Sequence, residues 1–309
     1  MIEISVIMPA LNEEEIIQQC CENVIQELHS LNRPFEIILI DDGSTDNTKE
    51  CIVMLSKKYP QVRGIILSRN FGHQSALLAG MHNSKGNAVI MMDCDLQHPP
   101  KLLKIMHQYW KNGYKIVYTV RQRTVGATCV KNISSWMYYF LFNLISETKI
   151  PKYAADFRLI DRQIVDVLNN MPESSIYFRG LLSWVGYKQI GVPYTAEKRG
   201  GGKTSYSLPK MWALAIDSLF RFSSFPLYLI LYLGLLGMVA SMLYGSFIIW
   251  HWWNGAVIQG WSSVLLINLI FSNLSMICIG IIGRYVDTLF VEAKKRPHYL
   301  ISEYINQNE

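Results

Sequence analysis

Short apolar runs alternate with amphipathic segments through the first hundred residues of this chain. The runs at 3–9, 35–40, 62–67 and just before Asp93 have the composition of buried strands, and a segment of helical periodicity follows each of the first three. A polar cluster stands at the end of every run. Repeated β–α units of this kind predict a parallel sheet with flanking helices, whose carboxyl edge gathers the polar clusters and binds ligands.

The pattern changes near Arg221. Residues 222–283 contain no Asp, Glu, Lys or Arg, and two apolar runs, 227–250 and 262–283, are each long enough to cross a hydrocarbon core, which needs roughly 20 residues. A Trp-rich connector joins the runs, and basic residues flank both outer ends. The positive-inside rule places both ends in the cytoplasm, so this region is predicted to form a transmembrane hairpin.

These patterns divide the chain into four parts. Residues 1–205 are predicted to form a cytoplasmic α/β domain, 206–224 an amphipathic juxtamembrane segment, 225–283 two transmembrane helices, and 284–309 a basic cytoplasmic tail. Because Met1 leads directly into a strand, no signal peptide is expected.

Composition agrees with membrane attachment. Apolar residues make up 50% of the chain and charged residues only 17%, a more hydrophobic composition than is usual for a soluble protein. The net charge of +5 suits an anionic lipid surface, and no aromatic-and-basic repeat favours a nucleic-acid partner. The six cysteines lack metal-ligand spacing, which indicates reduced thiols in the cytoplasm.

The fourth apolar run ends in two carboxylates, Asp93 and Asp95, and the prolines that follow stop the strand. Residues i and i+2 of an extended segment point the same way, so both acids are expected to share one divalent cation, with Gln97 as a neutral oxygen ligand. Oxygen ligands suit Mg²⁺ or Mn²⁺. A solvated acidic turn is the competing interpretation, and it is favoured if the pattern is taken alone.

Two earlier clusters carry candidate nucleotide ligands. Asn12 is predicted to be the N-cap of the first helix. Asp42, at the tip of the second strand, is placed to accept a hydrogen bond from a uracil N–H or a ribose hydroxyl, and capping of the next helix by its cluster is an equal alternative. Because no glycine-rich phosphate loop occurs, carboxylates and a metal would have to hold a nucleotide.

Three later segments have two interpretations each. The helical segment 132–146 either lies on a membrane surface or packs in the core. An Asp-x-Arg pair, Asp156 and Arg158, taken alone predicts an ion pair that supports a loop. Glycines 200–202, between basic residues, form either a mobile anion-binding loop or a linker.

Four motifs occur in a characteristic order, namely Pro9-x-x-Asn12-Glu13, Asp41-Asp42-Gly43-Ser44, Arg69-Asn70-Phe71-Gly72 and Asp93-x-Asp95-x-Gln97. Together they resemble the family 2 glycosyltransferases of GT-A fold. Within that family the chain is similar to the polyprenyl-phosphate hexosyltransferases, which include bactoprenol glucosyltransferases and dolichol-phosphate mannose synthases. The resemblance implies a Rossmann-like, mostly parallel sheet with flanking helices, followed by the two-helix transmembrane hairpin.

The resemblance also implies roles for individual residues. The nucleotide sugar would be bound by Pro9, Asn12, Glu13, Asp42 and Asp93, and a Mg²⁺ or Mn²⁺ ion by Asp93, Asp95 and Gln97. Asp156 would face the reaction centre and act in catalysis with Asp95 and Arg121. The candidate clamps for an acceptor phosphate are Arg121, Arg123, Lys131, Arg199, Lys203 and Ser205.

The function implied is inverting transfer of a hexose, from UDP-glucose, to undecaprenyl phosphate, for modification of a cell-surface glycan such as O-antigen. The enzyme would be a multi-pass protein of the bacterial inner membrane with its catalytic domain in the cytoplasm, and its relatives are often homo-oligomers. The first alternative is the same reaction with GDP-mannose, a UDP-N-acetylhexosamine or a UDP-amino-arabinose as donor. The second is a non-catalytic, membrane-anchored nucleotide sensor or flippase partner.

Overall fold

The computed structural model describes residues 2–121, 151, 154–171, 177–195, 225–254 and 260–306. The chain separates into two compact units. The first comprises Met1–Tyr139, Thr148–Tyr206 and Arg296–Glu309, and the second comprises Phe140–Glu147 and Ser207–Lys295.

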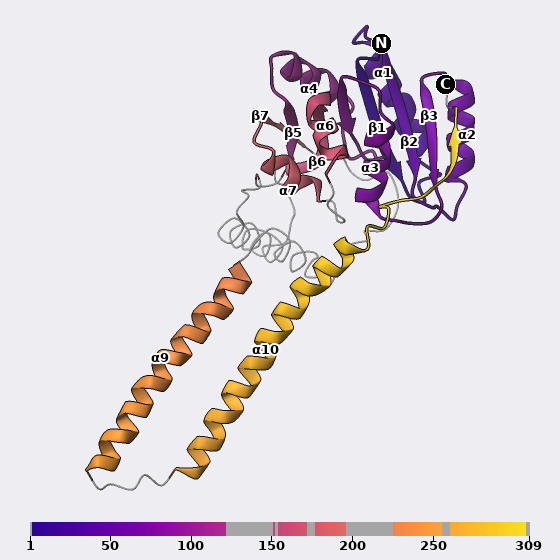
Figure 1. Cartoon of the computed structure of the whole chain (residues 1–309). Coiled ribbons are helices and arrows are strands. Elements are labelled where there is room, and N and C mark those ends of the chain that lie inside the picture. The colour runs from indigo at the N-terminus through magenta and orange to yellow at the C-terminus, as the bar shows by residue number, and fades with distance from the viewer. Residues whose placement is uncertain are drawn as a thin grey trace. The chain divides into compact units, whose positions relative to one another are not determined.

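The first unit is an α/β domain (Figure 1). Its described elements are, in chain order, β1 (Ile4–Ala10), α1 (Ile17–His29), β2 (Phe35–Asp41), α2 (Thr48–Lys58), β3 (Val62–Leu67), α3 (His73–Asn83), β4 (Ala88–Met91), α4 (Leu102–Lys111), β5 (Ile116–Arg121), β6 (Ala154–Asp161), α6 (Arg162–Asn169), α7 (Phe178–Trp184), β7 (Gln189–Tyr194) and β8 (Ile301–Ile305). The predicted β–α repeats of the first hundred residues are confirmed.

The strands form one sheet with the order β7-β5-β6-β4-β1-β2-β3-β8. The four central strands β4, β1, β2 and β3 are parallel, as predicted. The sheet as a whole is mixed, because β6 runs antiparallel to both of its neighbours and β8 runs antiparallel to β3. Since the central strands are parallel, the loops that follow β1, β2 and β4 meet at one edge of the sheet.

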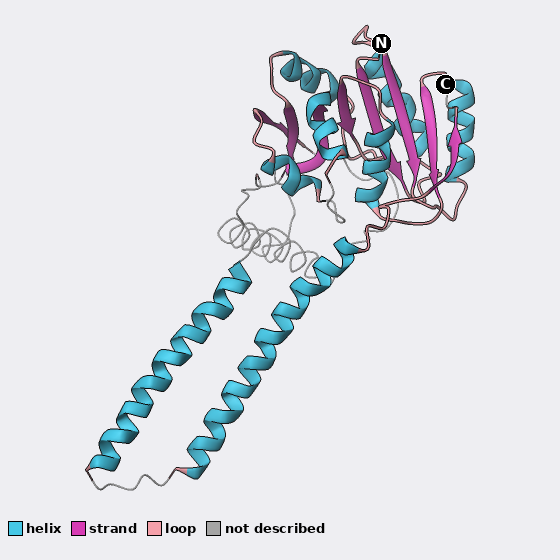
Figure 2. Ribbon diagram, in the orientation of Figure 1, coloured by secondary structure: helices cyan, strands magenta, loops and turns pink. Residues whose placement is uncertain are grey.

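Helices cover both faces of this sheet (Figure 2). On one face α1, α2 and α4 join the sheet in an apolar cluster that includes Val24, Leu55 and Met106. On the other face α3 packs so closely on the sheet that a Cβ on Gly80 would stand 2.9 Å from Cβ of Ile7. Burial of both faces explains why β1 and β2 read as continuous apolar runs.

The C-terminal residues differ from the predicted basic tail, 284–309. They include the last turns of a long helix and then β8, which completes the edge of the sheet beside β3. Asn306 fixes the end of β8 because its Nδ2 group donates to the carbonyl of Val62 at 2.8 Å, and Lys49 pairs with Glu303 at 2.7 Å. The strand is short and its pairing is with a distant segment, so the local pattern did not reveal it.

The second unit contains two long apolar helices, α9 (Phe225–Trp253) and α10 (Trp261–Ala293). Both are long and apolar enough to cross a membrane, by length and composition. The segments that meet this criterion are Phe225–His251 and Ile270–Ala293. They overlap the runs predicted from the sequence, and α10 continues ten residues past Gly283.

Candidate active site

The loops after β1 and β2 are joined by hydrogen bonds that involve Asn12. Its side-chain Oδ1 accepts from the backbone N–H of Thr45 at 2.8 Å, and its own N–H donates to Oγ of Ser44 at 3.0 Å. The predicted capping role of Asn12 is wrong, because α1 begins five residues later, at Ile17, and no side chain caps it. Asn12 has a φ of 56°, a left-handed conformation that Asn tolerates and that turns the chain toward the second loop.

Glu13 and Pro9 lie beside this junction. The backbone N–H of Glu13 donates to Oγ1 of Thr48 at 3.0 Å, at the start of α2. Pro9 lies within β1, opposite Ile40 of β2. Both residues are therefore positioned by the parallel pairing of β1 and β2, near the end of the two strands.

Asp42 is almost fully buried, and both of its oxygens are occupied. Oδ1 accepts from the backbone N–H of Phe71 at 2.8 Å, and Oδ2 accepts from that of Gly72 at 3.0 Å. Burial raises the pKa of the Asp42 carboxyl, although the two backbone N–H groups act in the opposite direction. Asp42 thus anchors the third motif to the second. A Cβ at Gly43, which has a φ of +72°, would stand 2.5 Å from the backbone of Arg69, so the same contact requires glycine.

Another member of the cluster contacts the start of α2. Oδ1 of Asp46 accepts from the backbone N–H of Thr48 at 3.1 Å, at the first residue of the helix, whereas the N-cap residue, Asn47, makes no side-chain capping hydrogen bond. Within the cluster that was expected to cap α2, the residue that contacts the helix is therefore Asp46, not Asp42. Contact between Asp42 and a nucleoside stays a prediction.

Asp93 and Asp95 lie beyond the end of β4, in a bent segment. The strand ends at Met91, two residues before Asp93, and Leu96 has a φ of 61°. Oδ1 of Asp95 accepts from the N–H of Gln97 at 3.0 Å, which closes a local turn. The premise of an extended segment with both acids on one side is therefore wrong. Among the residues that the structure describes, no three His, Cys, Asp or Glu side chains gather as a metal site.

His73 pairs with Asp93, a contact that the sequence did not predict. Its Nε2 lies 2.7 Å from Oδ1 of Asp93, and the backbone N–H of Asp93 donates to Nδ1 of His98 at 3.1 Å. Burial alone would raise the pKa of Asp93, but the hydrogen bond with His73 and the electrostatic interactions with His98 and His73 lower it. Burial disfavours the charged form of His73, and Asp93 outweighs it, so the pKa of His73 is raised.

Asp156 lies on β6 and pairs with Arg179 of α7. Nε of Arg179 donates to Oδ1 of Asp156 at 2.8 Å, and Nη2 donates to Oδ2 at 2.7 Å. Burial raises the pKa of Asp156, but the opposing charge and hydrogen bonds of Arg179 outweigh it, and the pKa lies far below its usual range. The Asp156–Arg158 ion pair that the sequence suggested is not the pair observed, because Nε of Arg158 donates to the carbonyl of Ala155 instead.

Arg121 is the described residue of the predicted acceptor clamps. It ends β5 and lies opposite Tyr194 of β7, whose buried hydroxyl has a raised pKa and is within the electrostatic reach of Arg121, Asp93, Asp95 and Asp156. His98 stacks on Phe157 with ring centroids 5.0 Å apart. The structure therefore brings Arg121 into the same region as the three carboxylates. Of the other predicted clamps, Arg123, Lys131, Arg199, Lys203 and Ser205 lie outside the described residues.

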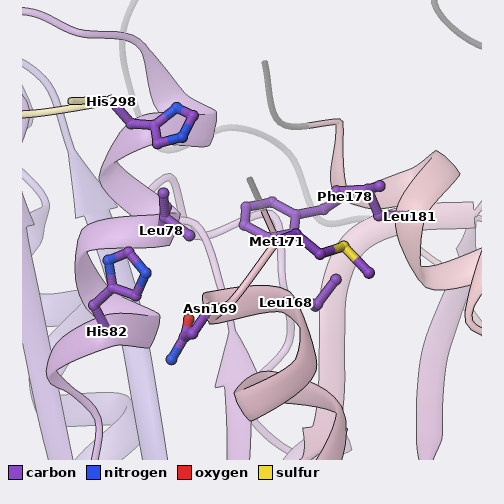
Figure 3. Close-up of a pocket in the computed structure, with 8 residues that line it drawn as sticks. All are labelled: Leu78, His82, Leu168, Asn169, Met171, Phe178, Leu181 and His298. Atoms are coloured by element: carbon purple, nitrogen blue, oxygen red, sulfur yellow. The ribbon is translucent and has the colours of Figure 1, made fainter. Parts of the chain in front are cut away.

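A small cavity of about 70 Å³ lies next to α7, lined by residues that include His82, His298, Phe178 and Leu181 (Figure 3). None of the predicted site residues lines it. Phe178 connects it to the site, since it precedes Arg179 on α7 and its N–H donates to Oε1 of Gln74 at 3.3 Å. The carboxyl edge of the sheet, rather than this cavity, carries the candidate chemistry.

A mixed sheet with helices on both faces, whose central parallel strands end in acidic loops, has the architecture of a GT-A glycosyltransferase. Residues 5–168 match the family model described as glycosyl transferase family 2, and the chain belongs to that family. It is therefore a glycosyltransferase, and the predicted fold class is confirmed.

Curated relatives align over nearly the whole chain. A glycosyltransferase of Bacillus subtilis, YkcC, is 37% identical and aligns over 98% of this chain and 94% of its own. The bactoprenol glucosyl transferase of Shigella phage SfII is 34% identical, over 97% of this chain and 98% of its own. A solved glucosyl-3-phosphoglycerate synthase from Mycobacterium tuberculosis is 19% identical, covers 71% of this chain and 77% of its own, and has a TM-score of 0.48.

Proposed function

We propose that this glycosyltransferase moves glucose from UDP-glucose to the phosphate of a polyprenyl lipid such as undecaprenyl phosphate, with inversion at the anomeric carbon. The observation that carries the proposal is the near full-length similarity to a bactoprenol glucosyl transferase, which extends across both apolar helices. A lipid acceptor explains those helices, because its phosphate lies at headgroup level and the catalytic domain must be held there.

The nucleotide sugar would occupy the carboxyl edge of the central strands. Pro9, Asn12, Glu13 and Asp42 would hold the nucleoside side, where the first three motifs are hydrogen-bonded to one another. The diphosphate would lie toward Asp93, because Asp93 follows β4 and Asp42 follows β2, the two strands that flank β1 in the sheet. The anomeric carbon of the bound sugar would then face Asp156.

By the chemistry of their side chains, Asp93, Asp95 and Gln97 suit a divalent cation. Asp93 is held as a carboxylate by its histidine neighbours, and Asp95 and Gln97 follow it in the segment after β4 and would supply further oxygen donors. A set made of oxygens suits Mg²⁺ or Mn²⁺ better than a softer metal. The cation would supply neutralisation of the charge that develops on the leaving diphosphate.

The acceptor does not need a strong base. A phosphate monoester has a second pKa of about 6, so at neutral pH the attacking oxygen is already largely anionic. What the protein must supply is positive charge that holds this phosphate in line with the anomeric carbon. Arg121 is the described member of the predicted clamps, and Arg123, Lys131, Arg199, Lys203 and Ser205 would complete the set.

The test is transfer to lipid from a panel of labelled nucleotide sugars. Membranes that contain the protein would be incubated with undecaprenyl phosphate and, separately, UDP-glucose, GDP-mannose, UDP-N-acetylglucosamine or a UDP-amino-arabinose, and the lipid would then be extracted. We expect label in the lipid from UDP-glucose, as the anomer opposite to that of the donor. If the lipid is labelled from another donor and not from UDP-glucose, the proposed sugar is wrong. If the product keeps the anomeric configuration of the donor, the proposed inverting mechanism is wrong.

A further inference from the structure

The three proposed cation ligands lie on one short loop, which a histidine side chain closes. Asp93, Asp95 and Gln97 are alternate residues of the segment that follows β4. The backbone N–H of Asp93 donates to Nδ1 of His98 at 3.1 Å, five residues further along the chain. This hydrogen bond closes the segment 93–98, here called the ligand loop, and all three proposed ligands lie within it.

The ligand loop contains no helix or strand that would fix its shape. Leu96 has a φ of 61°, a left-handed conformation that is unfavourable for a residue with a Cβ. The hydrogen bond from the N–H of Gln97 to Oδ1 of Asp95, at 3.0 Å, shapes only the middle of the loop. Because the ligand side chains take their direction from this main chain, a group that holds the main chain also places the ligands.

The ring of His98 is held by residues of two strands. It is 6% exposed and stacks on Phe157 of β6, with ring centroids 5.0 Å apart and an angle of 22° between the planes. Tyr194 of β7 meets it edge-on, with centroids 6.2 Å apart. Phe157 and Tyr194 are themselves buried. The imidazole therefore attaches the ligand loop to the sheet.

The two histidines beside Asp93 hold different parts of that residue. Nε2 of His73 lies 2.7 Å from Oδ1 of the carboxylate. Nδ1 of His98 accepts from the backbone N–H, and Nε2 of His98 lies 3.9 Å from Oδ2 of Asp93, beyond hydrogen-bond distance. A cation at the carboxylate would compete with His73, whereas the contact of His98 with the main chain is compatible with a bound cation.

We propose that His98 is a positioning residue of the donor site. Through the backbone N–H of Asp93, it holds the ligand loop in the shape that lets Asp93, Asp95 and Gln97 bind a divalent cation with the diphosphate of the nucleotide sugar. This inference rests on the proposed function, which places the cation and the diphosphate at this loop. His98 acts only through the main chain and the packing of its ring, and it contacts neither group.

The test separates the acceptor atom of His98 from its ring. His98→Phe keeps an aromatic ring for stacking and removes Nδ1, whereas His98→Asn loses the ring and keeps an oxygen acceptor close to the position of Nδ1. His107→Phe is the matched control, because His107 is also buried, lies beside the ring of Trp110 and pairs with Glu3 at 2.8 Å, directly before β1 and at the opposite edge of the sheet.

The measurements use the full-length protein, purified in detergent. UDP affinity would be measured by calorimetry in Mn²⁺ and in EDTA, with Tm as a check of folding. Transfer would be measured as kcat and as the apparent KM for UDP-glucose and for undecaprenyl phosphate. UDP binding reports on the donor site whether or not the protein transfers sugar to a lipid, so it tests the inference separately from the acceptor.

His98→Phe is expected to weaken UDP binding in Mn²⁺ by about tenfold, the effect of losing one hydrogen bond that shapes the loop. UDP binding in EDTA and the apparent KM for undecaprenyl phosphate should stay within about twofold of wild type. His98→Asn should bind UDP in Mn²⁺ within about threefold of wild type, although its Tm falls further than that of His98→Phe because stacking on Phe157 is lost. His107→Phe should lower Tm and leave UDP affinity unchanged.

The opposite rank of the two His98 variants in affinity and in Tm distinguishes positioning from packing. Unchanged UDP affinity of His98→Phe in Mn²⁺ would overturn the inference. Equal losses of affinity in His98→Phe and His98→Asn would also overturn it, because the ring and not the acceptor atom would then matter. A loss of the same size in Mn²⁺ and in EDTA would place the effect on the nucleoside side, with the same consequence.

Two results for the wild type separate the inference from the proposed function. If wild-type protein binds UDP equally in Mn²⁺ and in EDTA, the proposed cation site is wrong and the inference is wrong with it. If it glycosylates no polyprenyl phosphate but binds UDP in a metal-dependent way, and the variants rank as expected, the proposed function is wrong and the role of His98 in the donor site is supported.

Discussion

The two sides of the carboxyl edge hold their acidic and amide side chains in different ways. On the side of β1 and β2, Asn12 and Asp42 accept hydrogen bonds from backbone N–H groups of neighbouring loops. On the side of β4 and β6, Asp93 and Asp156 are held by the cationic side chains of His73 and Arg179. Backbone donors fix the shape of a loop, whereas side-chain cations can also engage an incoming anion or release a carboxylate to a metal.

This comparison separates two consequences of substitution. Changes at the backbone-bonded side should first lower stability, because they leave backbone N–H groups of the neighbouring loops without their acceptors. Changes at the cation-held side should first lower transfer, because they remove charges that act on substrate, with less effect on folding.

The largest effect is expected at Asp95. Asp95→Asn keeps the size of the side chain and removes one negative charge from the proposed cation site, so transfer should fall at least about a hundredfold. The measurement is lipid glycosylation by purified protein, with Tm as a check of folding and EDTA treatment of wild type as a parallel sample. Full activity of this variant in the presence of EDTA would remove the metal assignment.

The next effect concerns the basic glycine loop. If Arg199 and Lys203 close over the acceptor phosphate, replacing both with Ala removes charge-assisted contacts of about 1.5–3 kcal/mol each, a loss of roughly a hundredfold or more in transfer efficiency. UDP affinity, measured by calorimetry, should stay within twofold of wild type. A parallel loss of UDP affinity would move the loop to the donor, and no change in either quantity would make it a linker.

A stability effect is expected on the backbone-bonded side. Asp42→Ala leaves the N–H groups of Phe71 and Gly72 without their acceptor, which should cost roughly 2–4 kcal/mol in the free energy of unfolding. Chemical denaturation measures it. Asp166→Ala is the control, because the Asp166 side chain is 60% exposed and loss of its pair with Arg162 should cost less than about 1 kcal/mol. Equal destabilisation by both variants would contradict the anchoring role of Asp42.

The smallest expected effect is on the pH dependence of stability, which should have opposite signs at Asp42 and Asp156. The pKa of Asp42 is raised in the folded state, so protonation favours the fold and its contribution to stability grows as pH falls through that pKa. The pKa of Asp156 is depressed, so its contribution is present above about pH 4, the unfolded value, and is lost below it.

Thermal unfolding between pH 7 and pH 3 reads out these signs. The Tm difference between wild type and Asp42→Asn should grow as pH falls, and that between wild type and Asp156→Asn should shrink, each by about 2–4 °C. The same trend for both variants would contradict the assignment of opposite electrostatic environments.

The pattern of apolar and polar residues predicted the elements that form from residues close together in the chain. The strand 62–67 and the helix after Asp46 were read from apolar runs and polar breaks, because each forms from neighbouring residues. β6 and β8 were not, since both pair with strands distant in sequence and run antiparallel to them. Their place in the sheet depends on tertiary pairing, which a single sequence does not display.

The site shows the same division. The sequence predicted that Asp42, Asp93 and Asp95 follow strand ends, and the resemblance singled out Asp156, but neither predicted the partners of these residues. Arg179 is 23 residues from Asp156 and lies on another element, and nothing in its local pattern indicates that pair. His73 had a usable signal, because it directly follows the Arg69–Gly72 motif, at the first residue of α3.

The central claim is that this membrane-associated protein transfers sugar to a polyprenyl phosphate. The most direct measurement incubates purified full-length protein with UDP-glucose labelled in the sugar, with and without undecaprenyl phosphate, and counts label in the extracted lipid. We predict label in the lipid that requires the polyprenyl phosphate and is released as glucose by mild acid. Absence of lipid-linked label, with the label recovered as free glucose or as intact UDP-glucose, would contradict the claim.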